Sequence, residues 1–228
     1  AEEFYAKMKA EGDAERPVMY GMNSTLVKGA DGTIYEDLWT TGNKYGKSLQ
    51  KVVENLKLAW AWAEDAKQRE VIEKLVQFYE TGDLKVFDEY SIAWLQNTEP
   101  LVDFVNGFTE SYGDPLGMKA SWESIVNFKD LEATKRTEVL SSNAQWFEDH
   151  SPVAPEFKKE KVKGVTAKVI KAAILGGDLY PSTAIGINLP NSNWVRAEYG
   201  SKSVTIANLT HAYAQASKGS GMLQEFAC

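Results

Sequence analysis

The chain has 228 residues, of which 43% are hydrophobic and 25% charged, and its formal net charge is −7. This length and composition are typical of a globular protein with one large or two modest domains. The negative charge argues against a nucleic acid or an anionic membrane as partner, and no apolar run approaches the length of a membrane span. The single cysteine, Cys228, excludes an internal disulfide and is compatible with a reducing compartment.

Residues 1–98 predict a β-hairpin followed by helices. Residues 24–40 contain two β-branched runs on either side of Asp31-Gly32, which is a strong signal for a two-residue turn. Apolar residues then keep helical spacing over residues 49–60 and again over residues 71–79.

The ends of these helices have their own signals. Gly82 is placed to end the second helix, and Asp83 can cap a third one that runs through Trp94. The aromatic segment WAWAED at 60–65 is interpreted as core because of its helical spacing. An aromatic platform for a ligand is the alternative.

The pattern changes at Pro100. Alternating apolar residues predict a strand over 101–109 and a second over 121–128, separated by a turn rich in Gly, Asp and Pro. Asp130 then opens a helix that is expected to continue through Phe147.

The last third predicts shorter elements. In chain order these are a proline-punctuated connector, an element of open type, an extended stretch and a terminal segment that turns helical: 151–160, 165–175, 183–191 and 203–217. We therefore expect an α+β fold. Its two sections would be a hairpin with helices over 1–98 and a mixed β-core over 99–228, incomplete at its C-terminal end.

Several common catalytic motifs are absent. The two histidines, His150 and His211, have no metal-ligand spacing and are interpreted as surface or loop residues. There is no Gly-rich phosphate loop and no serine nucleophile elbow, and Cys228 has no histidine near it in sequence. Taken alone, the chain contains no complete catalytic constellation.

One candidate site lies in the stretch NGFTESYGDPLG, where Glu110 and Tyr112 follow the first predicted strand. If the strand's period of two continues, both side chains point to the same face as Phe104 and Phe108. A carboxylate can bind an ammonium group, and a phenol can donate to an oxyanion. A structural role, in which Glu110 pairs with an arginine and Tyr112 packs on Phe108, is equally compatible with the pattern.

A second candidate is PSTAIGINLPN, residues 181–191. Proline at both borders confines this strand to a sheet edge, and Gly186 lets another backbone come close. Asn188 and Asn191 place amide groups at its end. Such a strand could receive an extended peptide by β-augmentation. The alternative is an ordinary edge strand that runs into an Asn-Pro-Asn turn.

Together, these stretches resemble the dipeptidyl peptidase III family, zinc exopeptidases that remove dipeptides from the free N-terminus of short peptides. The likeness extends over nearly the whole chain and is to bacterial members of the Bacteroides type in particular. Its motifs are NSTLVK (23–28), TGDLKVFDEYSIAWL (81–95), ESYGDPLG (110–117), GMKASWESIVNFKDLEATKRTE (117–138) and GINLPN (186–191), followed by Arg196.

The resemblance implies a two-lobed protein with a wide cleft. One lobe is largely helical and carries zinc in an HExxGH helix, and the other contains a five-stranded β-core. This chain resembles the section upstream of the zinc helix, and HExxGH is absent from it. We therefore expect zinc in the full-length enzyme, no zinc ligand in this chain, and no activity from this chain alone.

The resemblance also implies roles for particular residues. Glu110, Asn188 and Asn191 would bind the peptide's ammonium group. Tyr112 would hydrogen-bond the scissile carbonyl and the developing oxyanion, and Glu123 would line the cleft. The residues whose main chain would pair with the peptide are Thr183, Ala184, Ile185, Gly186, Ile187 and Asn188.

The implied partners are short peptides with a free N-terminus and the zinc-bearing remainder of the same protein, without nucleic acid or membrane. The implied location is cytoplasmic, with export possible in bacteria. Two alternatives are a non-catalytic peptide-binding module and an interaction scaffold without a metal site.

Both chain ends lack the features of natural termini, so we expect a section of a longer protein. Such a section should leave apolar side chains uncovered where its packing partners are missing. Near the C-terminal end these would be Ile206, Leu209, Leu223 and Phe226.

Overall fold

The computed structural model describes residues 1–162 and 165–218. It divides into two compact units. Unit 1 consists of Ala1–Pro100, Asn106–Glu123 and Pro190–Gly200, and unit 2 consists of Leu101–Val105, Ser124–Leu189 and the chain from Ser201 on. Unit 1 is therefore assembled from three separate stretches of the chain.

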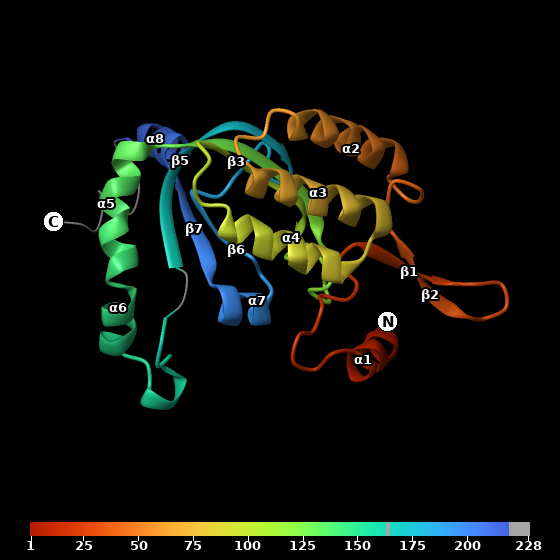
Figure 1. Cartoon of the computed structure of the whole chain (residues 1–228). Helices are drawn as coiled ribbons and strands as arrows, with labels where there is room; N and C mark the ends of the chain where they lie inside the picture. The colour runs from red at the N-terminus through yellow and green to blue at the C-terminus, as the bar shows by residue number, and fades with distance from the viewer. Residues whose placement is uncertain (163–164, 219–228) are drawn as a thin grey trace. The chain divides into compact units, whose positions relative to one another are not determined.

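The elements of unit 1 are five helices and a hairpin (Figure 1): α1 (Glu2–Glu11), β1 (Ser24–Lys28), β2 (Ile34–Leu38), α2 (Gly46–Trp60), α3 (Ala66–Thr81), α4 (Leu84–Gln96) and α7 (Asn193–Tyr199). The hairpin and the three central helices lie where the sequence predicts them. In the hairpin, Ser24 pairs with Leu38 and Lys28 with Ile34 in antiparallel register. The connection therefore spans residues 29–33, so the predicted two-residue turn is wrong, and Gly32 provides a positive φ of 86° within this longer turn. The sequence patterns did not indicate α1 or α7.

The signals for the helix ends are confirmed. Gly82 follows α3 with φ 72°, and its N–H donates to the carbonyl of Phe78 at 2.7 Å. A Cβ at this position would lie 2.9 Å from Cγ2 of Thr40, so glycine is required by both conformation and space. One residue later, the carboxylate of Asp83 accepts from the N–H of Lys85 at 2.8 Å and caps α4.

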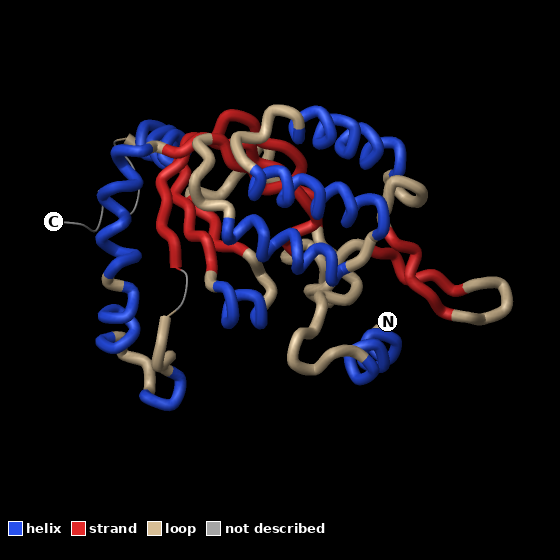
Figure 2. Tube along the Cα trace, in the orientation of Figure 1, coloured by secondary structure: helices blue, strands red, loops and turns tan. Residues whose placement is uncertain are grey.

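Helices α2, α3 and α4 pack side by side, as the tube in Figure 2 shows. Their core is the buried face of α3, where Val71, Leu75, Phe78 and Tyr79 are 0–1% exposed. The hydroxyl of Tyr79 donates to Asn106 and accepts from Nε1 of Trp122 at 2.8 Å. These two bonds join the buried face of α3 to the strands that precede and follow the Gly/Asp/Pro turn.

The interpretation of WAWAED as core is wrong. Helix α2 ends at Trp60, and the next two residues form a turn, so helical spacing no longer orients the side chains that follow. Trp60 is 40% exposed and Trp62 is 88% exposed.

Unit 2 holds most of a five-stranded sheet in the order β3-β4-β5-β7-β6. Strand β5 runs parallel to β7, and β6 runs antiparallel to it. The predicted α+β class is confirmed. The elements are β3 (Val102–Glu110), β4 (Ser121–Lys129), α5 (Leu131–Ser142), α6 (Ala144–His150), a 3-10 turn (Pro155–Phe157), β5 (Val165–Gly177), β6 (Gly186–Leu189), β7 (Ser201–Ile206) and α8 (Ala207–Ala216). The ends of β3 and β4 that flank the turn belong to unit 1.

Helix α5 packs along β5, the segment whose type the sequence left open. Thr134 Oγ1 lies within hydrogen-bonding distance of both the carbonyl and the N–H of Val169, and Thr137 Oγ1 donates to the carbonyl of Ala167 at 2.8 Å. These hydroxyls satisfy backbone groups of the strand. The helix expected to run through Phe147 is interrupted at Asn143, so it is two helices.

A buried ion pair connects two strands of unit 2. Lys202 on β7 is 1% exposed, and its Nζ lies 3.2 Å from the Asp103 carboxylate on β3. Burial lowers the pKa of Lys202, and the Asp103 charge opposes that shift.

The expected exposure of Ile206 is wrong, since this side chain is 0% exposed. It is the last residue of β7, a strand that pairs with β5 on one side and β6 on the other. Leu209 is partly exposed, and Leu223 and Phe226 lie outside the described residues.

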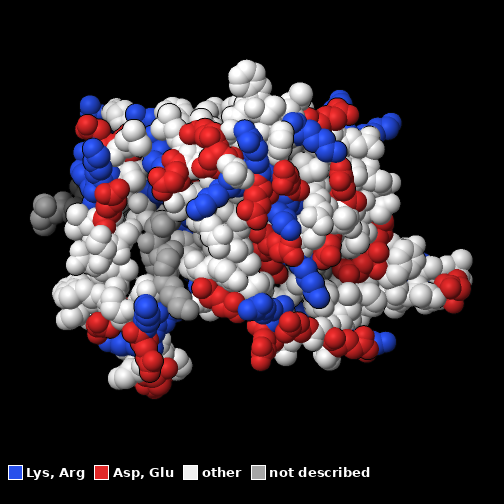
Figure 3. All heavy atoms as spheres, in the orientation of Figure 1, with Lys and Arg blue, Asp and Glu red and all other residues white. Residues whose placement is uncertain are grey.

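On the face seen in Figure 3, positive and negative side chains are interspersed. Within the described residues, no helix combines the length and apolarity needed to cross a bilayer.

Candidate functional site

The end of β3 brings two of the predicted residues together. Nδ2 of Asn191 donates to the carbonyl of Thr109 at 3.2 Å and to Oε2 of Glu110 at 3.3 Å. Glu110 and Asn191 are 81 residues apart in the chain, and both are partly buried in unit 1. The carboxylate has acceptor positions beyond the one that Asn191 occupies. A half-buried carboxylate with a fixed orientation is suited to bind a cation such as an ammonium group.

Tyr112 does not lie on the strand. Strand β3 ends at Glu110, and Tyr112 is 92% exposed in the turn that follows. The expectation that it continues the alternation of Phe104 and Phe108 is therefore wrong, because pleated geometry stops with the strand. The phenol is open to solvent and available to a ligand.

The turn that carries Tyr112 is held by Asp114. The Asp114 carboxylate accepts from the N–H groups of Met118 and Lys119 at 2.9 and 3.0 Å. These backbone groups hold the pKa of Asp114 below its ordinary value, with Lys119 the larger contributor. The Gly/Asp/Pro motif thus forms a defined loop.

Glu123 occupies a different environment. It lies on β4, where its side chain is 3% exposed. On the same strand, Ser121 Oγ donates to the backbone carbonyl of Glu110 at 3.1 Å. Strand β4 therefore supports the backbone of Glu110, and Glu123 is part of the interior.

Strand β6 forms the edge of the sheet, as its proline borders predict, and pairs only with β7 among the described strands. The N–H of Ile206 donates to the carbonyl of Ile185 at 2.9 Å, and Ile187 stands opposite Val204. In an antiparallel pair, hydrogen-bonded and non-hydrogen-bonded positions alternate. Ile187 therefore bonds to β7, and the N–H and C=O groups of Gly186 and Asn188 point to the open edge.

Gly186 makes a close approach on the closed side of this strand. A Cβ there would lie 3.0 Å from the carbonyl oxygen of Val204 on β7. The backbone that approaches Gly186 is thus the neighbouring strand of the sheet.

The remaining predicted residues of this segment make contacts within unit 2. The carbonyl of Thr183 accepts from the hydroxyl of Tyr213 at 3.1 Å, and Oδ1 of Asn188 accepts from Ser203 at 3.2 Å. Thr183 is buried, and Ala184 and Ile185 are exposed. Strand geometry begins only at Gly186, so Thr183, Ala184 and Ile185 precede the strand.

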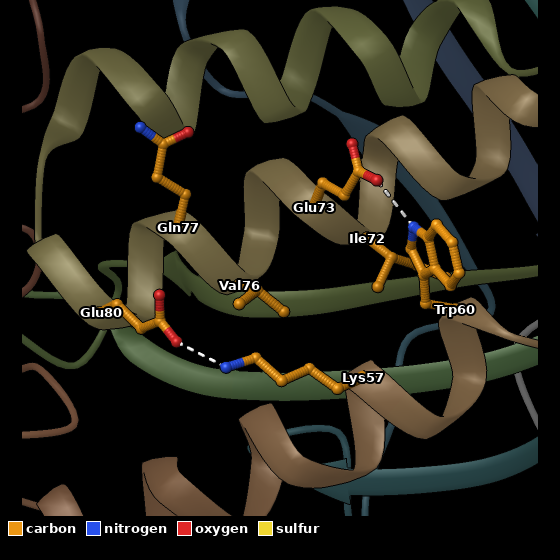
Figure 4. A pocket seen from close by; sticks show the side chains of 7 residues that line it. All are labelled: Lys57, Trp60, Ile72, Glu73, Val76, Gln77 and Glu80. Atoms are coloured by element: carbon orange, nitrogen blue, oxygen red, sulfur yellow. Dashed lines mark hydrogen bonds and ion pairs between the residues drawn. The ribbon is translucent and has the colours of Figure 1, made fainter.

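Unit 1 also contains two pockets that sequence reasoning missed. One has a volume of about 370 Å³ and its aromatic walls are Trp39, Tyr45, Phe108 and Trp122. The other, about 380 Å³, lies between α2 and α3 (Figure 4). Lys57 and Glu80 form an ion pair at one end of it, and Nε1 of Trp60 donates to Glu73 at the other.

No group of three or more His, Cys, Asp or Glu side chains that could hold a metal ion occurs within residues 1–162 and 165–218. A zinc ion therefore does not fit any cluster of this part of the chain.

Comparison with known proteins decides the family. Residues 26–226 match Peptidase family M49. The chain belongs to peptidase family M49. Among its relatives, dipeptidyl peptidase 3 of Rattus norvegicus is 31% identical over 175 residues, and that of Dictyostelium discoideum is 30% identical over 179 residues. These matches include 76% and 77% of this chain but only 23% and 26% of the relatives.

Two solved structures share the fold of this chain. The structure of dipeptidyl-peptidase III from Corallococcus sp. strain EGB superposes with a TM-score of 0.78 at 24% identity, over 93% of this chain and 39% of that one. DPP III from Caldithrix abyssi gives a TM-score of 0.76 at 19% identity, over 95% of this chain and 41% of that one. The predicted family is confirmed, and the chain spans about a quarter of the length of its curated relatives.

Proposed function

We propose that this chain is the substrate-binding portion of a zinc-dependent dipeptidyl peptidase, which releases dipeptides from the N-terminus of short peptides. Membership of M49 and the names of the relatives support a dipeptidyl peptidase. The observation that carries the binding role is the contact between Asn191 and Glu110 at the end of β3. The zinc belongs to residues outside this chain, so the chain alone has no hydrolytic activity.

In this proposal, Glu110 and Asn191 bind the peptide's terminal ammonium group. The ammonium donates to the Glu110 carboxylate, and the Asn191 amide fixes the orientation of that carboxylate. A charge-assisted bond of this kind discriminates against a blocked N-terminus, which has neither the charge nor all of the donors. When the N-terminus of the peptide is bound, only a peptide bond near that terminus can be cleaved.

The open edge of β6 binds peptide main chain. Gly186 and Asn188 present N–H and C=O groups away from β7, which is the arrangement that β-augmentation requires. Asn188 is three residues before Asn191 in the chain. The side chain of Asn188 is held by Ser203.

Tyr112 hydrogen-bonds the scissile carbonyl and the oxyanion that develops from it. Its exposure in a turn fixed by Asp114 supports this role. In the complete enzyme, Tyr112→Phe should lower kcat by about 10²–10³, with a smaller change in KM, because an oxyanion donor acts on the transition state. Steady-state kinetics on a dipeptidyl arylamide measures this, and a variant with near-normal kcat would refute the role.

The binding proposal is tested by calorimetry with the 228-residue chain. A tetrapeptide with a free N-terminus should bind more tightly than its N-acetylated form. Glu110→Gln should lower the affinity for the free peptide at least tenfold, since charge-assisted bonds contribute about 1.5–3 kcal/mol. Glu80→Gln, at an exposed carboxylate paired with Lys57, is the control and should bind like wild type. Equal affinity for free and acetylated peptides would exclude ammonium recognition.

A second candidate is a peptide-binding module or interaction scaffold without metal chemistry, in which the open edge of β6 binds a peptide and no hydrolysis follows. The encoding reading frame separates the two. If HExxGH follows and the complete product hydrolyses dipeptidyl arylamides, the enzyme is supported, whereas a frame without it supports the module. A cytoplasmic location belongs to the same proposal and is tested by cell fractionation.

A further inference from the structure

A buried acid lies on α4, outside the residues assigned so far. Asp88 is in the middle of this helix and is 6% exposed. No ion pair among the described residues involves it. A buried carboxylate without a counter-charge is costly unless polar groups face it. Polar groups are therefore expected to face the Asp88 carboxylate.

The partners come from the stretch that contains α7, which packs on α4. Ser192 Oγ and Trp194 Nε1 are fully buried, and neither has a hydrogen-bond partner among the described residues. Burial raises the pKa of Asp88 to about 6, and the side chains of Trp194 and Ser192 keep it from rising further. Both donors are thus close enough to act on the carboxylate, although neither reaches full hydrogen-bond geometry.

These two donors flank the first residue of α7, and they lie one and three residues after Asn191. Asn191 in turn donates to Glu110 and to the carbonyl of Thr109. We propose that Asp88 is a positioning residue: its carboxylate anchors Ser192 and Trp194 and thereby holds Asn191 against Glu110. The consequence for peptide binding rests on the proposed function, but the anchor itself does not.

The neighbouring charges do not explain the environment of Asp88. Glu89 on α4 pairs with Lys74 on α3, and Glu198 on α7 pairs with Arg16. The Arg16 guanidinium also lies 5.3 Å from the centroid of the Trp194 ring. The other titratable groups of α7, Arg196 and Tyr199, and Lys85 on α4 make no contribution to the pKa of Asp88, which burial and the two donors determine.

The anchor therefore has a defined pH dependence. Above about pH 6, Asp88 is ionised and attracts both donors. Protonation removes the negative charge and weakens its attraction for Ser192 and Trp194. The position of Asn191 should loosen as the pH falls through about 6.

Side-chain NMR of the 228-residue chain tests the anchor without any peptide. The indole N–H resonance of Trp194, assigned with Trp194→Phe, should titrate with a midpoint near 6. The Nδ2 resonances of Asn191 should titrate with the same midpoint. Both titrations should vanish in Asp88→Asn and persist in Glu89→Gln, a control on the same helix whose carboxylate is exposed.

Two outcomes overturn the proposal. If the Trp194 resonance does not titrate in wild type, Asp88 does not anchor this segment. If Trp194 titrates but Asn191 does not, the anchor exists without positioning Asn191. The wild-type titration needs no variant, and Ser192→Ala, which leaves α4 intact, should reduce the Asn191 titration if Asp88→Asn fails to fold.

Peptide binding then measures the consequence. At pH 7.5, Asp88→Asn should lower the affinity for a tetrapeptide with a free N-terminus about tenfold, because one or two hydrogen bonds of ordinary strength are lost. Glu89→Gln should bind this tetrapeptide like wild type. Wild-type affinity should fall below pH 6. If wild type binds no peptide, the proposed function fails, and the NMR titrations still decide whether Asp88 positions Asn191.

Discussion

The two units bury charge in different ways. In unit 2, Lys202 is 1% exposed and has the Asp103 carboxylate 3.2 Å away. In unit 1, Asp88 is 6% exposed and is faced by an indole and a hydroxyl rather than a cation. Both groups have pKa values shifted toward the neutral form, because burial penalises charge in each case.

The two buried groups differ in where their partners lie in the molecule. The ion pair of unit 2 joins β7 to β3, and neither of its residues is a candidate site residue. The partners of Asp88 belong to a short segment that also carries Asn191, so the state of the acid affects a candidate binding residue. A buried charge held by dipoles titrates near neutral pH, and such groups are concentrated at functional sites. Three predictions test this contrast.

The largest effect should come from Lys202→Met. This change removes the cation and leaves Asp103 with its charge partly buried, so the free energy of unfolding should fall by about 3 kcal/mol or more. Urea denaturation at pH 7 measures this difference. Adding Asp103→Leu should restore most of the loss, since a buried pair can be replaced by apolar side chains. A single variant within 1 kcal/mol of wild type would show that the pair contributes little.

An intermediate effect should appear in the pH dependence of Asp88→Asn. The folded pKa of Asp88 is raised above its unfolded value, so its contribution is fully present below about pH 4 and is lost as the pH rises through about 6. Relative to Asp88→Asn, wild type should lose about 2 kcal/mol of unfolding free energy between pH 4 and pH 7. Denaturation at several pH values measures this loss. Glu89→Gln should show no such loss. If the difference in unfolding free energy between wild type and Asp88→Asn does not change with pH, the pKa of Asp88 in the wild-type protein lies near its ordinary value.

The smallest effect should come from an exposed ion pair. Lys57 and Glu80 lie 2.8 Å apart with side chains 59% and 46% exposed (Figure 4). Lys57→Met should change the unfolding free energy by less than about 0.5 kcal/mol, because water and salt screen such a pair. The change should shrink further in 1 M salt. A loss comparable to that of Lys202→Met would remove the distinction between buried and exposed pairs.

Local signals predicted much of the fold. Asp31-Gly32 specified a hairpin turn, Gly82 and Asp83 specified the junction between two helices, and the alternation after Pro100 specified two strands. Each of these depends on the residue's own backbone preference or on side chains a few positions away. Such signals fail where the local geometry ends, as at Tyr112 and Trp62, which lie just past a strand and a helix.

Only part of the candidate site could be predicted in the same way. Glu110 and Asn191 were each identified, but their contact depends on 81 intervening residues. Strand β6 was predicted at an edge because proline restricts pairing, whereas the side that remains open is decided by its register with β7. Asp88 was missed, because an aspartate on a helix is ordinarily exposed.

The sequence by itself determined the family, the α+β class and several element ends, such as those at Gly82 and Asp83, since these depend on motifs and short-range preferences. Tertiary structure decided which side chains are buried and which distant residues meet. Burial and long-range contact depend on how segments pack together, and that packing turned Asp88 into a buried acid and brought Asn191 to Glu110.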